Sequence, residues 1–465
     1  MTKSQVYIKE FIIMRTKKHL LILFTVFLSF IILLAACNTR DDESSKTDTS
    51  SVSTSSVAES KADESTVSEP TDESGDESSQ DEVSLDPITN DPTEYLNILA
   101  STLTDKNCFV VVGNCEEGAV ITATTAGKQS VTAVSDSGFY SVRLKKEDVK
   151  TRVKIVAKGS ITEQFVADVE PVVPTSEMWP IIGGNGYQFF FQSMMPDFTQ
   201  ETRLSNSEVN ALTEKIQSRI STLKESLPNT EIIYMIVPSK ASIYPERVPD
   251  GYVKGTGKSR LEQVNEALAA GGATVIDLLD IYQEHKDDKY KIYWGTDSHW
   301  TDYGAFIAYT ELFNYISERF PSAAPRKEIE FNFKGDYYNG GDMVYYMMMN
   351  QNIVREYNYY REPKFALNSD IASVPRYRAA NYLMYSEATV QERVFNTNRS
   401  KLPDLYIMRD SFGAHIYDIF ADRGNTTVYK GMWNFTYNLN EIKSYQPDYI
   451  IYVMTEWNIK NVLQG

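Results

Sequence analysis

Cysteine and histidine are scarce in this chain of 465 residues, which contains three cysteines and four histidines. The four-cysteine spacing of a zinc knuckle is absent, so the sequence predicts no structural metal site. Basic residues are also outnumbered: 46 Lys and Arg oppose 63 Asp and Glu, for a formal net charge of −17. A nucleic-acid-binding protein needs a basic surface that neutralises phosphates, so the sequence excludes this class.

Aromatic residues are missing between Asn38 and Asp91, where Ser, Thr, Asp and Glu dominate. Fifteen acidic residues between Asp41 and Asn90 face only two lysines, so this segment carries −13 of the net charge. Such a segment buries too little apolar surface to offset the loss of chain entropy on folding. We predict that residues 38–95 form a disordered, extended tether.

A long apolar run precedes the tether, from Leu20 to Ala36, and it ends at Cys37. Lysines before an apolar run that closes on small residues are typical of a secretory signal peptide. A cysteine directly after two alanines occupies the position at which bacterial lipoproteins are lipidated. We predict that residues 1–37 form a lipoprotein signal, starting at the first or second methionine, and that the remaining chain is lipid-anchored outside the cytoplasm. A single membrane-spanning anchor is the alternative, because the run is close to the length that crosses a bilayer.

Cys108 and Cys115 are the two cysteines that follow the signal. Outside the cytoplasm two such cysteines can oxidise to a disulfide. Their spacing equally suits two positions of a bent strand that never meet, so the sequence leaves the pairing open.

Short β-prone runs broken by glycine or charged turns fill residues 96–172. This pattern predicts a small β-sandwich domain. The segments at residues 113–120 and 135–142 resemble parts of bacterial immunoglobulin-like domains. The resemblance implies a spacer on the cell surface, with sugar binding as the alternative.

Helical and strand patterns alternate in residues 175–465, which predicts an α/β domain. The predicted helices and strands are 205–227, 231–237, 260–270, 273–279, 301–320, 404–408 and 448–454. Helices that alternate with strands rich in β-branched residues imply a mostly parallel sheet covered on both faces. The chemistry of such sheets lies at the carboxyl ends of the strands.

Ser411 follows the predicted strand 404–408, at a sharp turn where we expect Asp410 to cap the next helix. A serine at such a turn can present its hydroxyl at the top of the sheet, with its own amide facing a developing oxyanion. It needs a histidine to take its proton, and the candidates are His285, His299 and His415.

Among these histidines, His299 has Asp297 two residues away, in a segment too irregular for a helix. An aspartate that fixes the imidazole tautomer completes the logic of a Ser-His-Asp triad. His285 lies among charged residues that indicate a solvated helix end, and His415 has only Asp418 nearby. The alternatives are that Asp297 caps a turn beside a packed His299, or that the two bind a metal, for which a third ligand is missing.

The sequence Asp297-Ser298-His299-Trp300, followed much later by Asp410-Ser411-Phe412, resembles the SGNH hydrolase-like domains of the alginate acetylation proteins and their DHHW relatives. Similar motifs extend over about residues 175–460. The chain departs from the family at Tyr187, Gln188 and Trp457. The resemblance implies that Ser411 is the nucleophile, His299 the base and Asp297 its orienting residue. It also implies an active-site role for Tyr417, whose alternative is packing inside a helix.

Members of this family O-acetylate exported polysaccharides through an acyl-serine, and a separate membrane-bound O-acyltransferase delivers the acetyl group. The resemblance therefore implies an extracytoplasmic O-acetyltransferase with these partners. No cofactor is expected, since the chain has no coenzyme-binding fingerprint. The alternatives are an acetylesterase with the same triad and a non-catalytic lipoprotein that binds glycan. The sequence does not identify the acceptor polysaccharide. The tether and the spacer favour a protein that reaches through a thick wall, as in a Gram-positive cell.

Overall fold

The computed structural model describes twelve stretches of the chain. They are residues 97–105, 108–115, 118–125, 128–133, 139–145, 152–158, 164–168, 180–183, 189–248, 251–346, 355–374 and 390–464. The predicted signal peptide, Cys37 and the acidic tether lie outside these residues. Within the described stretches, no helix is both long and apolar enough to cross a bilayer.

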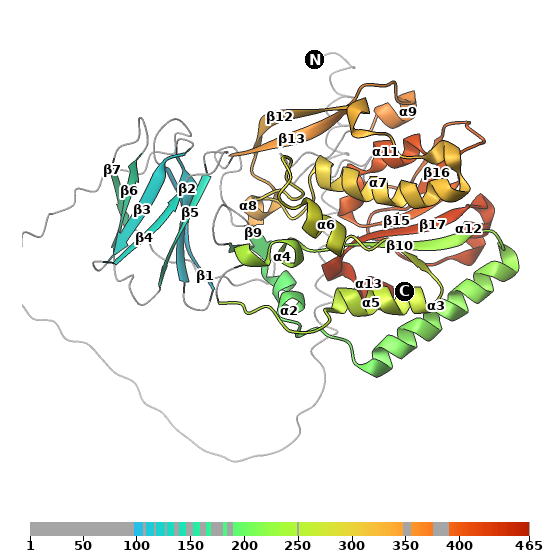
Figure 1. Ribbon diagram of the computed structural model, residues 1–465, viewed down its shortest axis with the longest axis horizontal. Helices are drawn as coiled ribbons and strands as arrows, with labels where there is room; N and C mark the ends of the chain where they lie inside the picture. Colours follow the sequence, from blue (N-terminus) through green and yellow to red (C-terminus); the bar gives the residue numbers. More distant parts are fainter. Residues whose placement is uncertain are drawn as a thin grey trace, which may run out of the picture. The chain divides into compact units, whose positions relative to one another are not determined.

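Seven strands form two antiparallel sheets in the first part of the described chain (Figure 1). The first sheet has the order β1-β2-β5 and the second the order β4-β3-β6-β7. The strands are β1 (Asn97–Asp105), β2 (Cys108–Asn114), β3 (Val120–Thr125), β4 (Lys128–Ala133), β5 (Phe139–Lys145), β6 (Arg152–Lys158) and β7 (Gln164–Asp168). Val111 and Tyr140 of one sheet share a buried core with Ile121 and Ile155 of the other, as in a sandwich.

Strand β2 also decides how the two cysteines of this region lie. Cys108 is its first residue and Cys115 follows its last. Seven steps of extended chain at ~3.3 Å each put their Cα atoms roughly 20 Å apart, whereas a disulfide needs Cα atoms within about 7 Å. The strand therefore holds the two residues apart, which favours the alternative that they do not pair.

A six-stranded sheet with the order β11-β10-β17-β15-β16-β14 forms the centre of the second part. All neighbouring strands are parallel except β14 and β16, which are antiparallel. The strands are β10 (Glu231–Val237), β11 (Thr274–Val275), β14 (Arg393–Asn396), β15 (Leu405–Arg409), β16 (Thr426–Tyr429) and β17 (Tyr449–Thr455). The predicted α/β class with a mostly parallel sheet is confirmed.

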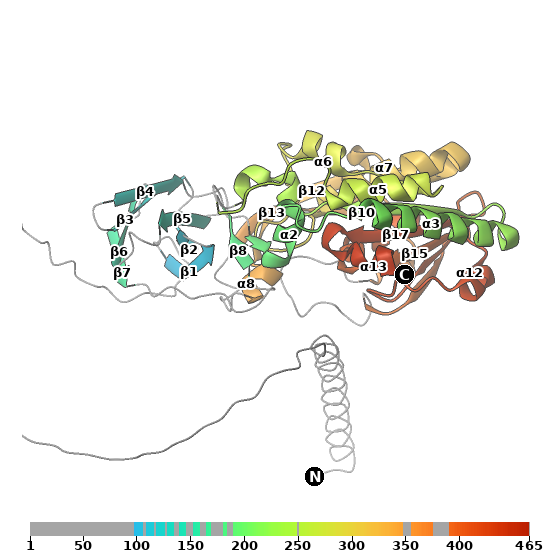
Figure 2. The same cartoon turned by 90° about the horizontal axis from the view of Figure 1, so that it is seen from below.

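Helices cover both faces of this sheet (Figures 1 and 2). They include α3 (Asn206–Ser226), α5 (Arg260–Ala270), α6 (Leu279–His285), α7 (Asp302–Arg319), α11 (Tyr417–Asp422), α12 (Leu439–Tyr445) and α13 (Lys460–Gln464). Alternate residues of β10 enter two separate cores: Ile233 packs with α7 and α11, while Tyr234 packs with α3 and α5. Both faces of the strand are buried, which explains its unbroken apolar sequence.

The boundaries of the helices follow from local capping. Ser205 and Ser259 each form a capping box with the glutamate three residues later, and these open α3 and α5. The predicted strand 273–279 is wrong beyond β11. The side chain of Asp277 accepts the amide of Leu279 at 3.0 Å, which starts α6 there.

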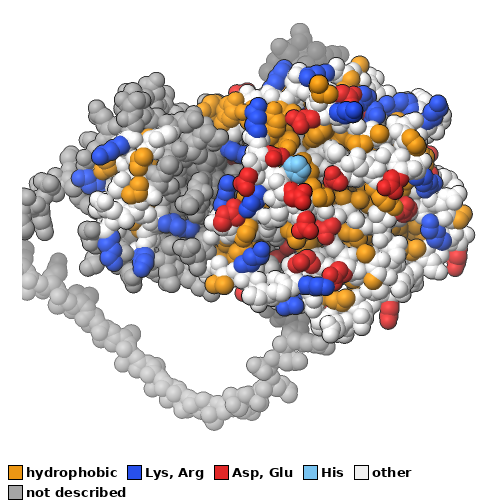
Figure 3. Space-filling model, in the orientation of Figure 1, with side chains coloured by type: hydrophobic (Ala, Val, Ile, Leu, Met, Phe, Trp, Pro, Cys, Tyr) orange, Lys and Arg blue, Asp and Glu red, His pale blue; other side chains and the backbone are white. Residues whose placement is uncertain are grey.

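A long hairpin lies between α7 and β14 in the chain. It consists of β12 (Phe331–Asn339) and β13 (Arg355–Pro363), which pair antiparallel with Phe331 opposite Pro363. The sequence pattern does not predict this hairpin. On the face shown in Figure 3, basic and acidic side chains are interspersed over the α/β part of the described chain.

Candidate active site

Ser411 lies at the carboxyl end of the central strand β15. It opens a 3₁₀ turn, Ser411–His415, for which Asp410 is the N-cap residue, as predicted. The Oδ1 atom of Asp410 accepts the amide of Phe412 at 3.0 Å, and its Oδ2 atom accepts the amide of Thr455 at 2.8 Å. Asp410 therefore ties the turn that carries Ser411 to the end of the neighbouring strand β17.

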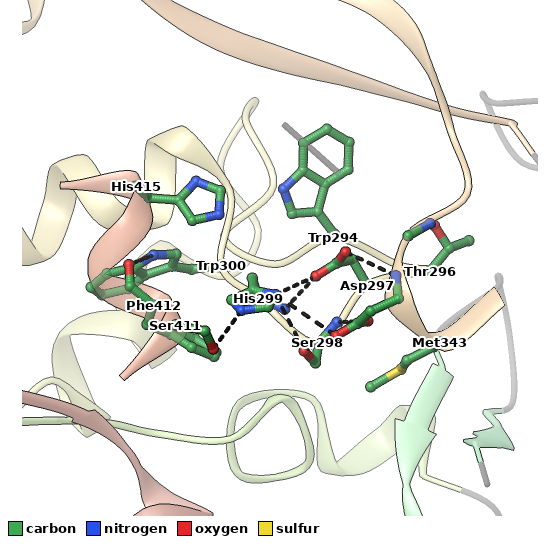
Figure 4. A network of polar contacts seen from close by, with 12 residues as sticks. Trp294, Thr296, Asp297, Ser298, His299, Trp300, Met343, Ser411, Phe412 and His415 are labelled. Carbon is green, nitrogen blue, oxygen red and sulfur yellow. Dashed lines mark hydrogen bonds and ion pairs between the residues drawn. The ribbon is translucent and has the colours of Figure 1, made fainter. Parts of the chain in front are cut away.

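The structure brings the three residues of the predicted triad into one chain of hydrogen bonds (Figure 4). The Nε2 atom of His299 lies 2.8 Å from Oγ of Ser411, and its Nδ1 atom lies 2.6 Å from Oδ1 of Asp297. The same Oδ1 atom accepts the amide of His299 at 2.9 Å. Asp297 and His299 are buried, and Ser411 alone is partly exposed. A substrate therefore reaches the serine but not the two residues behind it.

The charges of the pair favour one protonation state. Burial acts to raise the pKa of Asp297, but the charge of His299 and the hydrogen bonds it accepts hold this pKa well below its usual range. Burial acts to lower the pKa of His299, but the charge of Asp297 outweighs it and raises this pKa. With Asp297 ionised, Nδ1 of His299 carries the hydrogen and Nε2 is free to accept the Ser411 hydroxyl proton.

A third carboxylate, Asp342, lies behind the triad, and the sequence analysis assigned it no role. It is the first residue of α8 (Asp342–Tyr346) and accepts the amide of Ser298 at 2.7 Å. Its own amide donates to Oδ2 of Asp297 at 3.0 Å. Burial and the charge of Asp297 raise the pKa of Asp342 to about 7. Asp342 thus fixes both the loop and the second oxygen of Asp297.

Asp342 also supplies the third group that the metal alternative lacked, since ligand atoms of Asp297, His299 and Asp342 lie within 4.8 Å of one another. Two of these groups, Asp297 and His299, are joined by a hydrogen bond, and the carboxylate of Asp342 accepts hydrogen bonds from the amide and the hydroxyl of Ser298. The bond between Asp297 and His299 is 2.6 Å long, and a cation would have to break it. The residues fit a hydrogen-bonded triad better than a metal site.

Two further buried side chains, Lys240 and Glu356, hold the loop of Asp297 and His299, and the sequence did not reveal this role. Lys240, just after β10, donates to the carbonyls of Trp294 at 2.9 Å, Gly295 at 3.2 Å and Asp297 at 2.7 Å. Glu356 of β13 accepts the amides of Gly295 at 2.8 Å and Thr296 at 3.0 Å. An irregular buried loop leaves its backbone groups unpaired, and these two side chains satisfy them.

We expect Lys240→Met to lower the free energy of unfolding by about 3 kcal/mol, because it leaves three buried carbonyls and nearby carboxylates without their cation. Burial already lowers the pKa of Lys240 to about 8 despite the carboxylates around it. Urea denaturation measures the loss. The control is Lys258→Met, an exposed lysine paired with Glu266, for which we expect a change within about 0.5 kcal/mol. Equal effects of the two variants would contradict this role of Lys240.

One glycine is required by this packing. A Cβ atom on Gly341 would clash with Cβ and Oδ2 of Asp297. The start of α8 approaches the triad closely only because residue 341 has no side chain.

Comparison with known proteins finds a family similar to part of this chain. Residues 196–365 match the family described as the SGNH hydrolase-like domain of the acetyltransferase AlgX. Over these residues, the predicted family resemblance is confirmed. The matched range includes Asp297 and His299 and ends before Ser411.

Three individual proteins are also similar to this chain. A probable alginate O-acetylase AlgJ of Azotobacter vinelandii is 25% identical over 134 residues, which cover 28% of this chain and 32% of that protein. A DHHW family protein from Eubacterium siraeum is 14% identical with a TM-score of 0.43, covering 67% of this chain and 95% of that one. Bacillus cereus PatB1 is 17% identical with a TM-score of 0.41, covering 55% and 91%. The chain thus matches about a third of the curated relative's length.

Of the other two candidate histidines, His415 lies beside the triad, with the centre of its ring 6.0 Å from that of His299 (Figure 4), and His285 lies at the end of α6. His285 is half-buried, and its Nδ1 atom is 2.7 Å from Asp288. His415 is buried, and its Nδ1 atom is 3.4 Å from Oδ1 of Asp302. Burial lowers the pKa of His415. Neither arrangement offers a base to Ser411 comparable to His299.

Tyr417 is buried at the start of α11. The Arg409 guanidinium lies 4.6 Å from the centre of its ring and donates to its hydroxyl. Its ring also packs against Phe395 and Tyr429. These contacts lie within the core, and they favour the alternative that Tyr417 packs inside a helix over an active-site role.

The raised pKa of His299 predicts how activity depends on pH. His299 must be neutral to accept a proton, so kcat/KM rises with pH through this pKa, and its midpoint should lie above ~6.5, the usual value for histidine. The charge of Asp342 contributes to the increase in the pKa. Asp342→Asn should therefore move the midpoint to lower pH in a pH-rate profile. A midpoint that stays the same or rises would contradict this assignment.

Proposed function

We propose that this chain is an SGNH-type serine O-acetyltransferase that acts on a cell-surface or exported polysaccharide. The observation that carries the proposal is the chain of hydrogen bonds that links Asp297, His299 and Ser411 at the carboxyl edge of the sheet. Among these three residues only the serine is open to substrate. The family matched by residues 196–365 is described as an acetyltransferase, and the relative from Azotobacter vinelandii as a probable alginate O-acetylase.

In the first step, Oγ of Ser411 attacks the carbonyl carbon of an acetyl ester while Nε2 of His299 takes the hydroxyl proton. The tetrahedral intermediate expels the donor alcohol, which receives this proton, and the acetyl group remains on Ser411. Asp297 stabilises the imidazolium that forms between the two events. The amide of Ser411 is our candidate donor to the oxyanion.

In the second step, a sugar hydroxyl takes the place of the donor alcohol. It gives its proton to His299, attacks the acetyl carbon and leaves as an acetylated sugar, and Ser411 regains its proton. Neither step needs a cofactor.

The wider organisation of the chain is part of the proposal. We propose a lipoprotein signal over residues 1–37 with lipidation at Cys37, a tether over 38–95, an immunoglobulin-like spacer over 96–172 and the catalytic domain over 175–465. This order places the enzyme outside the cytoplasmic membrane of a bacterium, beside a membrane-bound O-acyltransferase that supplies acetyl groups.

The experiment that tests this function offers the full chain an aryl acetate as donor, with and without an oligosaccharide acceptor, and measures acetyl-sugar and free acetate separately. We expect acetyl-sugar to exceed acetate at saturating acceptor, and the Ser411→Ala variant to make neither. Acetate alone, unaffected by sugar, would identify an esterase instead. Such an outcome would keep the triad but contradict the transfer to sugar.

A further inference from the structure

Trp433 lies in the loop that follows β16, beside the turn that carries Ser411. Its amide donates to the carbonyl of Arg409 at 2.9 Å, and Arg409 is two residues before Ser411. This hydrogen bond joins the loop to the carboxyl end of β15. The loop is therefore part of the same edge of the sheet as the triad.

The backbone of Trp433 has a conformation that a tryptophan rarely adopts. The amide of Asn434 donates to the carbonyl of Gly431 at 3.0 Å, which closes a β-turn with Trp433 at its third position. Its φ is +62°, a value that β-turns of this kind reserve for glycine. The other described residues with positive φ that are not glycine are Gln200, Asn398 and Gln446, so Trp433 is the aromatic one among them.

The side chain of Trp433 is also unusually open to solvent. It is 52% exposed, whereas Trp294 and Trp300, which flank the Asp297 loop, are buried. Packing in the core therefore does not explain why a large aromatic residue stands at a glycine position. Strained residues that packing does not require are concentrated at binding and active sites.

We infer that Trp433 is a stacking surface for a pyranose ring of the acceptor polysaccharide, an inference that rests on the proposed function. One face of a pyranose consists of C–H groups, and an exposed indole offers a flat apolar surface of matching size. The hydrogen bond to Arg409 holds the backbone of Trp433 next to β15, so we expect a sugar stacked on the indole to lie near the acetyl group on Ser411. The residue acts in the second step of the reaction and not in the first.

The test separates the two steps in the full chain. Formation of acetyl-Ser411 from an aryl acetate needs no sugar, so Trp433→Ala should form it at the wild-type rate. Transfer to neutral β-linked gluco- or N-acetylgluco-oligosaccharides should show KM raised about tenfold, the loss expected for one aromatic stack. Trp433→Phe keeps a flat ring and should restore most of the affinity.

A glycine variant separates binding from folding. Trp433→Gly suits the positive φ, so it should unfold at an equal or higher urea concentration than wild type while sharing the KM defect of Trp433→Ala. A role limited to stability would instead make both variants less stable without changing KM. A KM for Trp433→Ala equal to that of wild type would overturn the inference.

The experiment distinguishes a failure of the proposed function from a failure of the stacking surface. If the wild type forms no acetyl-Ser411, direct binding of the same oligosaccharides, followed by calorimetry, still tests Trp433. Binding about tenfold weaker in Trp433→Ala would support the stacking surface. Equal binding by both proteins would overturn it.

Discussion

Ser411→Ala is expected to lower kcat for acetyl transfer by about 10³-fold or more, since it removes the atom that forms the covalent intermediate. The residual rate would come from binding and from donors to the oxyanion. Oγ of Ser411 and Nε2 of His299 lie 2.8 Å apart and act in one proton transfer, so His299→Ala should cost a comparable factor. The double variant should be no slower than the slower single one, because residues that act as a unit are not additive. Steady-state kinetics with an aryl acetate measure all three.

A matched serine controls for the substitution itself. Ser207 is exposed in the first turn of α3, and Ser207→Ala should keep wild-type kinetics and stability within about 0.5 kcal/mol. If Ser411→Ala keeps more than a tenth of the wild-type rate while it remains folded, Ser411 is not the nucleophile.

Asp297→Asn is expected to lower kcat by about 10⁴-fold with little change of shape, as replacing the orienting aspartate does in Ser-His-Asp triads. An asparagine amide can donate to Nδ1 of His299, which then accepts, so Nε2 carries the hydrogen and faces Ser411 as a donor. The raised pKa of His299 also depends on the charge of Asp297. The variant should therefore show an acid limb at lower pH as well as a lower rate. A kcat within tenfold of wild type would show that Asp297 only caps the loop.

Local features of the sequence predicted much of the fold. Apolar patterns predicted α3 and α5, and the buried strands β10, β15 and β17 were found within one residue. The length of strand β11 was overestimated. It is an edge strand that pairs only through Thr274 and Val275, and the side chain of Asp277 then accepts the amide of Leu279, where α6 begins. Short edge elements are decided by one or two side chains, which apolar patterns do not reveal.

The site was predictable only in part. Asp297 and His299 stand two residues apart, but Ser411 is 112 residues from His299, and only the position of the serine after a strand and the family resemblance linked the two in the sequence. Nothing in the sequence near Lys240 or Glu356 shows that the fold buries both side chains against one loop. Such support for a site comes from elements distant in sequence, so the three-dimensional structure is needed to find it.

The central claim is that Ser411 carries the acetyl group between donor and sugar. Its most direct test is to expose the full chain briefly to an aryl acetate, quench with acid and locate the adduct by peptide mass spectrometry. Our account predicts acetylation of wild type at Ser411, no adduct at this position in Ser411→Ala, and loss of the adduct when an oligosaccharide is added before quenching. An adduct at another residue, or none in wild type, would contradict it.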